Sequence, residues 1–528
     1  MKFKLISLFI FLSFFSAKAQ SFDEQAYKLN RMLNLIKTFY VDTVDEPKLV
    51  EEAITAMLKK LDPHSIYISK KEVQRMNEPL QGGFDGIGVQ FNIFKDTLMV
   101  VGVIAGGPSE KLGIKAGDRI IIIDGDTVAG IGLQNSTVIK KLRGKKGTKV
   151  VVDILRRGVK KLLRFDITRD KIPIYSLDAA YMVDKKTAYI KLNRFAATSM
   201  KEFYKATDSL KRKGLKNIIL DLRGNGGGYL RTAINLADEF LEKGEMVVYT
   251  EGTHQARQDY KATARGDFEK GRLVILVDEG SASASEIVSG AIQDHDRGVI
   301  IGRRTFSKGL VQRPFNLPDG SMVRLTVAHY YTPSGRCIQK PYNKGIKEYS
   351  RDVWNRYKNG ELTNKDSIHF DEKLKYKTLK SKRTVYGGGG IMPDIFIPLD
   401  TTRLTDYYTK LRRKGILYQY TLDYIDKKRD SLLKAYPSFA KFKTSFVVTD
   451  AMLNTIKKTA EEKKILPKDT AEYQESINEI QLIIKSLIAR DLWTTSNFYE
   501  IINVDDEVLK KAIEIISDKK KYEKQLRD

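Results

Sequence analysis

The chain has 528 residues, of which 42% are hydrophobic and 30% are charged. This length is enough for two to four domains with large cores, and the composition excludes a chain that is disordered over most of its length. The formal net charge is +26, which would allow binding to nucleic acid or to anionic surfaces. However, the basic residues are scattered through Lys-rich, helix-like stretches without a zinc-finger or arginine-rich groove pattern. We therefore expect a solvated basic surface and no nucleic-acid partner.

The first twenty residues differ from the rest of the chain. A basic start is followed by an apolar run over residues 5–15 and by Ala17-Lys18-Ala19. This pattern predicts a cleaved signal peptide over residues 1–19, too short for a membrane-spanning helix. An uncleaved anchor is the alternative. We expect export without a stable membrane anchor. Cys337 is the only cysteine, which excludes a disulfide within the chain.

Residues 20–80 are predicted to form an N-terminal helical region that Asp62-Pro63 interrupts. Residues 82–170 differ, because glycines alternate there with short β-type runs and Asp124-Gly125 marks a hairpin. A short helix is expected over residues 136–142. The stretch resembles a PDZ domain, with residues 113–118 as its mid-domain loop.

A PDZ domain binds a peptide as an added strand at a sheet edge. The turn Gly86-Ile87-Gly88-Val89 would then direct backbone N–H groups at a terminal carboxylate, and Ile87 and Val89 would line an apolar pocket. The alternative is that these glycines serve only a tight turn. Arg143 is a candidate partner for a carboxylate or for the catalytic domain, against the alternative of a solvated arginine.

Residues 171–400 alternate strands and helices, which predicts an α/β domain with a charged insertion over residues 341–385. Residues 401–528 are Lys-rich and helical by period. No chemistry is evident in this helical extension, for which dimerisation or gating is our expectation. The fold class is thus an α/β multidomain protein: N-terminal helices, a β-rich PDZ domain, an α/β core and C-terminal helices.

The candidate nucleophile lies in Gly280-Ser281-Ala282-Ser283-Ala284-Ser285-Glu286, which follows an apolar strand and opens a helix. Backbone N–H groups at a helix start are unpaired, so the N–H of Ala284 could stabilise an oxyanion beside Ser283. The alternative is structural, because Ser283 and Glu286 fit a helix capping box. Ser281 and Ser285 compete with Ser283 for the nucleophilic role.

A serine hydroxyl needs a base. His295 is too far along the same helical segment, whereas His329 is not excluded by the sequence. Lys308 lies in Thr305-Phe306-Ser307-Lys308-Gly309, and a lysine can serve as the base when burial favours its neutral form. The alternative is a lysine that simply faces water.

A glycine-rich loop spans residues 221–228 after another apolar strand. A phosphate loop is the alternative, but no Gly-Lys-Ser/Thr follows and Tyr229 stands where a third dinucleotide-site glycine would be. We therefore expect Gly227 or Gly228 to form an oxyanion site together with Ala284.

Taken in order, these pieces resemble the bacterial carboxyl-terminal processing proteases, also called tail-specific proteases. The resemblance covers roughly residues 30–400 and rests on these segments: 61–65, the PDZ span, 221–228, 281–286, 305–312 and 331–336. Three positions depart from the family pattern: Ser307 for glycine, Asp278 for asparagine and Gly226 for proline.

The resemblance implies that Ser283 is the nucleophile and Lys308 the general base. Gln312 would orient the lysine, one helical turn away if that segment is helical, and Asp294 matches an acidic position often linked to the site. The implied substrates are proteins with apolar C-terminal tails. We expect cleavage to need no metal or cofactor, and we expect the protein to act in the periplasm. The terminal helices are candidates for homo-oligomer contacts.

We therefore predict an exported serine endopeptidase that captures C-terminal tails through its PDZ domain. Three alternative functions remain open. A non-catalytic PDZ scaffold would bind tails without cleaving them. A histidine-dependent protease would normally place its PDZ domain after the catalytic domain. A nucleic-acid binder would show salt-dependent DNA binding.

Overall fold

The structure, a computed structural model, describes residues 24–401 and 404–527. The predicted signal peptide, residues 1–19, lies outside the described residues. The chain divides into two compact units. Of the described residues, the smaller unit contains 24–70 and 312–326, and the larger unit contains 71–311, 327–401 and 404–527. Within the described ranges, no helix combines the length and apolar character needed to cross a membrane.

The smaller unit joins N-terminal helices to part of a β-hairpin. It contains a helix over residues 24–39, α2 (Glu46–Leu61) and the short strand β1 (Ile66–Ile68), which pairs antiparallel with β18 (Met322–Tyr331). Between α2 and β1, the Asp62 carboxylate accepts hydrogen bonds from the N–H groups of His64 and Ser65, at 2.7 and 2.8 Å, and from the Thr326 hydroxyl at 3.1 Å. The interruption predicted at Asp62 is therefore a turn leading into a strand that the helical pattern did not reveal.

The core of the larger unit is a six-stranded sheet in the order β10-β11-β12-β15-β16-β21. All neighbours are parallel except β10 and β11. Strands β12 and β15 are buried along their whole length, which explains their uninterrupted apolar sequences. The bounds are β10 (Leu177–Met182), β11 (Thr187–Leu192), β12 (Asn217–Asp221), β15 (Leu273–Val277), β16 (Val299–Gly302) and β21 (Ile395–Phe396).

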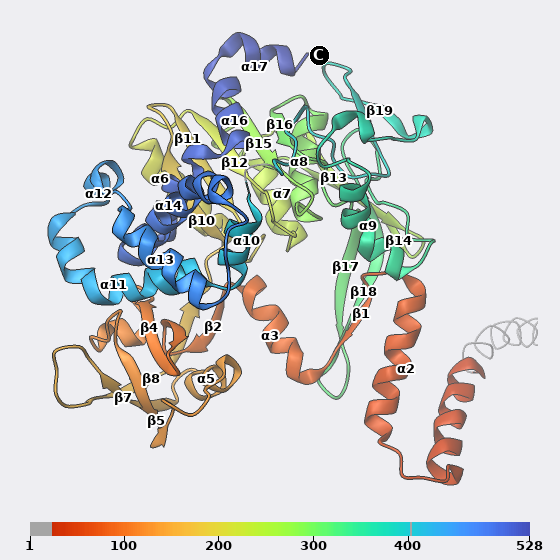
Figure 1. Ribbon diagram of the computed structural model, residues 1–528. Coiled ribbons are helices and arrows are strands. Elements are labelled where there is room, and N and C mark those ends of the chain that lie inside the picture. Colours follow the sequence, from red (N-terminus) through yellow and green to blue (C-terminus); the bar gives the residue numbers. More distant parts are fainter. Residues whose placement is uncertain (1–23, 402–403, 528) are drawn as a thin grey trace, which may run out of the picture. The chain divides into compact units, whose positions relative to one another are not determined.

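Helices cover both faces of this sheet (Figure 1). One face packs against α6 (Ser199–Lys211), α7 (Leu230–Asp238) and α8 (Ala284–Asp294). The opposite face packs against α16 (Glu507–Ser517), near the C-terminal end of the chain. Successive residues of β12 point to opposite faces, so Ile218 joins the first cluster and Ile219 the second. The C-terminal extension therefore supplies one of the three layers of the core.

A second sheet contains β13 (Met246–Gly252), β14 (Gln255–Lys261) and β17 (Leu310–Asn316), in addition to β1 and β18. The predicted insertion between residues 341 and 385 has regular structure. It contains α9 (Ile346–Lys358), two 3₁₀ turns (Lys365–Ser367 and Glu372–Leu374) and a small hairpin of β19 (Lys375–Lys377) and β20 (Thr384–Tyr386).

The PDZ region is a β-structure around its own core, in which Ile87, Val138 and Leu142 are buried. It follows α3 (Lys70–Gln81), and Asp124 and Gly125 both have positive φ at the predicted hairpin. Its elements are β3 (Val89–Phe94), β4 (Thr97–Val103), α4 (Pro108–Lys111), β5 (Arg119–Ile123), β6 (Asp126–Thr127), α5 (Asn135–Leu142), β7 (Lys149–Leu155) and β8 (Leu163–Thr168). The segments on either side pair as β2 (Gly83–Gly86) and β9 (Asp170–Pro173).

The C-terminal region is helical and has its own apolar cluster. It also contacts the PDZ region: Leu422 packs against Phe94 and Met99, and Arg119 forms a 2.7 Å ion pair with Asp426. The helices before α16 are α10 (Asp406–Arg413), α11 (Ile416–Ala435), α12 (Phe439–Ser445), α13 (Asp450–Glu462), α14 (Thr470–Leu492) and α15 (Thr495–Ile502), and α17 (Lys519–Gln525) follows it.

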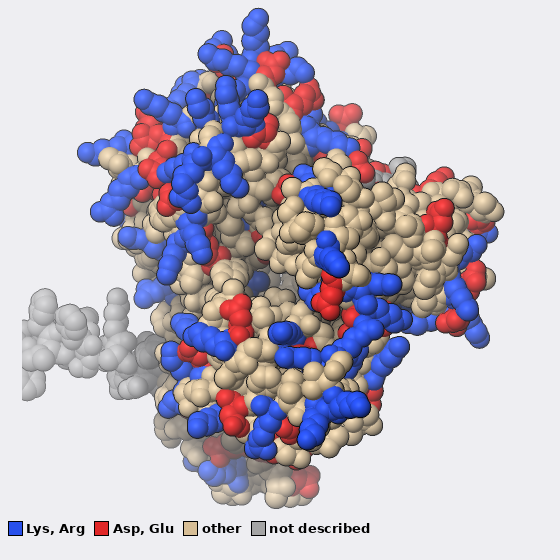
Figure 2. Space-filling model, turned by 90° about the vertical axis from the view of Figure 1, so that its left-hand side faces the viewer, with Lys and Arg blue, Asp and Glu red and all other residues tan. Residues whose placement is uncertain are grey.

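The predicted fold class is confirmed in its N-terminal helices, PDZ domain, α/β core and C-terminal helices. Figure 2 shows one face of the molecule, on which Lys and Arg side chains are spread out with Asp and Glu among them.

Candidate active site

Ser283 lies at the junction of β15 and α8. It is the residue that precedes the first turn of α8, and its φ of 55° and ψ of −111° are rare for a residue with a side chain. Ser283 is half-buried, whereas Ser281 and Ser285 are buried. The Ser281 hydroxyl donates to the Leu222 carbonyl at 2.9 Å, and the Ser285 hydroxyl donates to the Asn225 carbonyl at 2.8 Å. These two competing serines therefore tie α8 to the glycine-rich loop.

Glu286 connects the Ser283 turn to the loop that carries Lys308. Its buried carboxylate accepts hydrogen bonds from the N–H groups of Ser283 at 2.8 Å, Ser307 at 2.7 Å and Lys308 at 2.9 Å. The Thr305 hydroxyl donates to the same carboxylate at 2.5 Å. Burial raises the pKa of Glu286 to about 7, against the opposing effect of these donors. From the sequence, Glu286 was recognised only as the second residue of a capping box.

A residue of the insertion over residues 341–385 also binds the backbone of the loop that carries Lys308. Lys308 is half-buried, and Ser307 before it has a φ of 79°. The guanidinium of Arg356, on α9, donates to the carbonyls of Thr305 at 3.0 Å and Arg304 at 2.7 Å. The charged insertion therefore supports the backbone on the N-terminal side of Lys308, a role that its weak sequence pattern did not indicate.

The glycine-rich loop after β12 lies directly against the Ser283 turn. The N–H of Ala282 donates to the Asn225 carbonyl at 3.0 Å, and the Asp278 carboxylate accepts from the Gly224 N–H at 2.8 Å. Gly227 has a φ of 103°, and a Cβ atom added to it would lie 2.9 Å from the Ser283 Cβ and 3.1 Å from the Ala284 nitrogen. Only glycine fits this approach without displacing the neighbouring backbone.

The backbone N–H groups in this contact differ in their partners. The N–H of Gly227 donates to the Asn225 side-chain oxygen at 2.9 Å. Neither the N–H of Gly228 nor that of Ala284 donates to another residue in the part of the chain that the structure describes. These two N–H groups are thus the ones available to an incoming oxygen atom.

Two further sequence-predicted groups, Gln312 and Asp294, have contacts of their own. Gln312 belongs to β17, a strand rather than the helix considered for residues 308–312, and its side chain donates to the His64 carbonyl within the smaller unit. Asp294 ends α8, is fully buried, and pairs with Arg336 at 2.7 Å. The position is therefore a structural ion pair between α8 and the segment after β18.

The candidate histidines and the cysteine have partners of their own. His295 contacts the Met246 carbonyl at 2.7 Å, and the His329 ring lies 3.9 Å from the Cys337 sulfur. Burial raises the pKa of the Cys337 thiol, which disfavours a reactive thiolate.

The predicted carboxylate-binding turn of the PDZ region connects β2 to β3. Gly88 has a φ of 78°, and the Ile87 carbonyl accepts from the Ser109 hydroxyl at 2.7 Å. The N–H groups of Ile87 and Gly88 donate to none of the described residues. Arg143 forms a 2.6 Å ion pair with Glu78 on α3 and lies over the Phe84 ring. Because Ile87 is 2% exposed, its side chain belongs to the PDZ core.

Comparisons with known proteins match four parts of the chain. Family models match residues 13–72 (activating protease CtpB N-terminal domain), 86–167 (PDZ domain), 186–348 (peptidase family S41) and 407–495 (a family of unknown function).

The sequence is also similar to curated proteases. The carboxy-terminal processing protease CtpA of Bacillus subtilis is 37% identical over 330 residues, which cover 62% of this chain and 69% of that protein. The carboxy-terminal-processing protease of Bartonella bacilliformis is 38% identical over 324 residues, covering 60% and 73%. Among solved structures, the photosystem II D1 C-terminal processing protease matches with 26% identity and a TM-score of 0.36, over 70% of this chain and 86% of that one.

A PDZ domain combined with an S41 peptidase core defines the class of protein as a protease. The chain belongs to the carboxy-terminal processing proteases of peptidase family S41.

The close approach at Gly227 leads to a first prediction. Gly227→Ala should lower kcat for protein cleavage by about 100-fold, because the new Cβ would displace the Ser283 turn and alanine disfavours a positive φ. The matched control is Gly226→Ala, because a Cβ atom there meets nothing within 4 Å. The measurement is steady-state kinetics of both variants. Equal kcat values for Gly227→Ala and Gly226→Ala would show that the close approach of Gly227 to Ser283 does not affect cleavage.

The raised pKa of Glu286 leads to a second prediction. Its folded-state pKa of about 7 exceeds the usual 4.5, so this group's contribution to folding stability is complete below about pH 4.5 and falls as the pH rises towards 7. In Glu286→Gln that pH dependence should vanish, while kcat falls by about 10-fold to 100-fold because the amide cannot accept all four donors.

The measurement is the Tm of the wild type and of Glu286→Gln between pH 4.5 and 8. The wild type should lose Tm relative to the variant as the pH rises. A difference in Tm that stays constant over this range would contradict the assignment. Glu279→Gln is the control for a neighbouring carboxyl, whose pKa the Arg303 guanidinium holds below its usual range despite burial.

Proposed function

We propose that the protein is an exported serine endopeptidase that cleaves proteins after capturing their C-terminal tails. In this proposal Ser283 attacks the scissile carbonyl carbon and Lys308 accepts its proton. Lys308 then returns that proton to the leaving amine, and water hydrolyses the acyl-enzyme. The observation that carries the proposal is the Glu286 carboxylate, which binds the backbone of Ser283 and of Lys308 at the same time.

The proposed oxyanion donors are the N–H groups of Ala284 and Gly228. Both lack a partner among the described residues, and the Ala284 nitrogen is at the positive end of α8. Of the two glycines considered from the sequence, Gly227 is the weaker donor candidate because its N–H already donates to Asn225. Its role in the proposal is to allow the close approach of the two loops.

We also propose that Gln312 orients Lys308, and this part of the proposal rests on the family resemblance alone. Cleavage needs no metal or cofactor in this mechanism.

The proposed tail site is the turn between β2 and β3. The N–H groups of Ile87 and Gly88, which donate to none of the described residues, are suited to a terminal carboxylate, while a peptide strand would pair beside β3. Val89 is half-buried and can contribute to a pocket for an apolar last side chain. Arg143 would have to leave Glu78 before it could pair with a substrate carboxylate.

Homo-oligomer formation through the N-terminal helices is supported by exposed apolar side chains. Tyr27 and Phe39, in the helix over residues 24–39, are 68% and 76% exposed. Export to the periplasm rests on the signal-peptide pattern of residues 1–19.

The mechanism predicts that Ser283→Ala and Lys308→Ala each abolish cleavage of an unfolded protein with an apolar tail, with losses of at least about 1,000-fold. Lys344→Ala, at an exposed position, is the matched lysine control and should retain activity. The measurement is the rate of product formation, with circular dichroism to confirm folding. Cleavage by all three variants at the wild-type rate would place the nucleophile elsewhere.

Recognition of the C-terminal tail is best tested by changing the substrate, because the enzyme then remains the wild type. Amidation of the C-terminus removes the carboxylate charge, so kcat/KM should fall by about 10-fold or more relative to the same protein with a free carboxylate. A short internal peptide without a tail is the control, since its cleavage should not respond to amidation. Equal kcat/KM for the free and amidated tails would rule out carboxylate recognition.

A further inference from the structure

The C-terminal end of the chain supplies a charged partner to the glycine-rich loop. Residues 496–528 lie beyond the four matched family models, the last of which ends at residue 495. Asp506, immediately before α16, accepts from Arg223 Nη1 at 3.1 Å, and its second oxygen lies 2.8 Å from Arg223 Nη2. A segment without an assigned role thus contacts the loop that the proposed function uses for the oxyanion.

Arg223 is held between two carboxylates. Its Nε and Nη2 atoms donate to Asp221, at 3.0 and 2.7 Å, while its outer nitrogens bind Asp506. Asp221 is fully buried, and the charges of Arg223 and Lys191 hold its pKa well below the usual range although burial acts in the opposite direction. Because Asp221 is fully buried, removing either partner would leave an uncompensated buried charge, which favours a fixed geometry for this ion pair.

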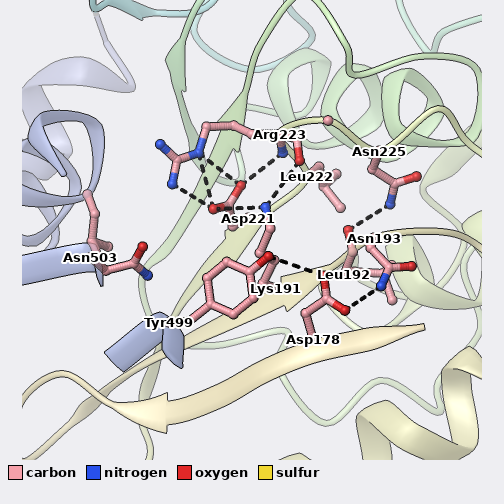
Figure 3. A network of polar contacts seen from close by, with 12 residues as sticks. Asp178, Lys191, Leu192, Asn193, Asp221, Leu222, Arg223, Asn225, Tyr499 and Asn503 are labelled. Atoms are coloured by element: carbon pink, nitrogen blue, oxygen red, sulfur yellow. Dashed lines mark hydrogen bonds and ion pairs between the residues drawn. The ribbon is translucent and has the colours of Figure 1, made fainter. Parts of the chain in front are cut away.

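The same neighbourhood contains further contacts between the sheet and α15 (Figure 3). Tyr499 places its ring 5.7 Å from Lys191 Nζ, and its hydroxyl donates to Asp178 at 3.4 Å. Lys191 in turn lies 3.4 Å from Asp221 and donates to the Arg223 carbonyl at 3.1 Å. The C-terminal helices therefore contact both the arginine and the lysine that pair with Asp221.

The loop is anchored step by step from this cluster towards Gly228. The Arg223 N–H donates to Asp221 at 2.9 Å, so both its backbone groups are fixed. Asn225 follows, with its side-chain NH₂ donating to the Leu192 carbonyl at 2.8 Å and its oxygen accepting from Gly227. A displacement of Arg223 would be transmitted along these short connections to the N–H group of Gly228.

We propose that Asp506 is a positioning residue for proteolysis, which acts through Arg223 on the oxyanion loop. The C-terminal helices would accordingly be part of the catalytic centre and not only an extension for dimerisation or gating. This inference rests on the proposed function of Gly228 and Ala284. Asp506 itself touches no reacting atom.

The sharpest variant is Asp506→Asn. Asp506 also caps α16 by accepting from the Leu509 N–H at 2.9 Å, and asparagine is an equally good cap. The substitution removes the negative charge and turns an NH₂ group towards the guanidinium while the helix start is kept. Asp505→Asn is the matched control, because Asp505 is the neighbouring acid, its side chain is 47% exposed, and it pairs with Lys510 at 3.0 Å.

The experiment measures kcat and KM for a tail-bearing protein in four variants: Asp506→Asn, Asp505→Asn, Arg223→Met and the double variant Asp506→Asn with Arg223→Met. We expect Asp506→Asn to lower kcat about 10-fold with KM unchanged, and Asp505→Asn to have no effect. Because Asp506 acts through Arg223, the double variant should be no less active than Arg223→Met alone.

Wild-type kcat in Asp506→Asn, or losses that multiply in the double variant, would overturn the proposal. Hydrogen exchange over residues 222–229 gives a second reading that does not depend on activity: exchange should increase in Asp506→Asn and not in Asp505→Asn. If Ser283→Ala remained active, the proposed function would fail, while unchanged exchange would independently refute the role of Asp506.

Discussion

The arrangement of the candidate site depends on one buried carboxylate. Glu286 accepts from three backbone N–H groups and one hydroxyl, so the turn at Ser283 and the loop at Lys308 share a single partner. A buried carboxyl without such donors would be costly, and two loops without such an acceptor would leave their N–H groups unpaired. The carboxylate and the two loops therefore stabilise each other. The strained backbone at Ser283 and Ser307 persists because these hydrogen bonds leave the loops little freedom.

Two segments outside the α/β core bind loops of the candidate site. Arg356, in the insertion, binds carbonyls just before Lys308, and Asp506, before α16, binds Arg223 at the start of the glycine-rich loop. The helix that carries this second contact also covers one face of the main sheet. Regions with weak sequence patterns therefore help to position the loops of the candidate site, because the groups that bind a loop's backbone fix its place.

Local patterns indicated much of the fold. The apolar run of β15, the helix of α8 and the glycine turn before β3 were all recognisable, because each depends on neighbours within about ten residues. Other features were not predictable in this way. The strand β1 has three residues and takes its identity from pairing with β18, more than 250 residues later. The regular structure of the insertion likewise depends on buried contacts such as those of Arg356.

The sequence by itself determined the order of the domains, the family and the candidate residues Ser283 and Lys308, because these follow from local periodicity and from short motifs. Only the tertiary structure decided which serine remains accessible, which glycine N–H lacks a partner among the described residues, and which charges surround Asp221. The hydroxyls of Ser281 and Ser285 donate to carbonyls of the glycine-rich loop, and the N–H of Gly227 donates to the Asn225 side chain, so these groups are weaker candidates than Ser283 and Gly228. The physical reason is that hydrogen-bond satisfaction and burial depend on residues distant in the chain, which no local pattern encodes.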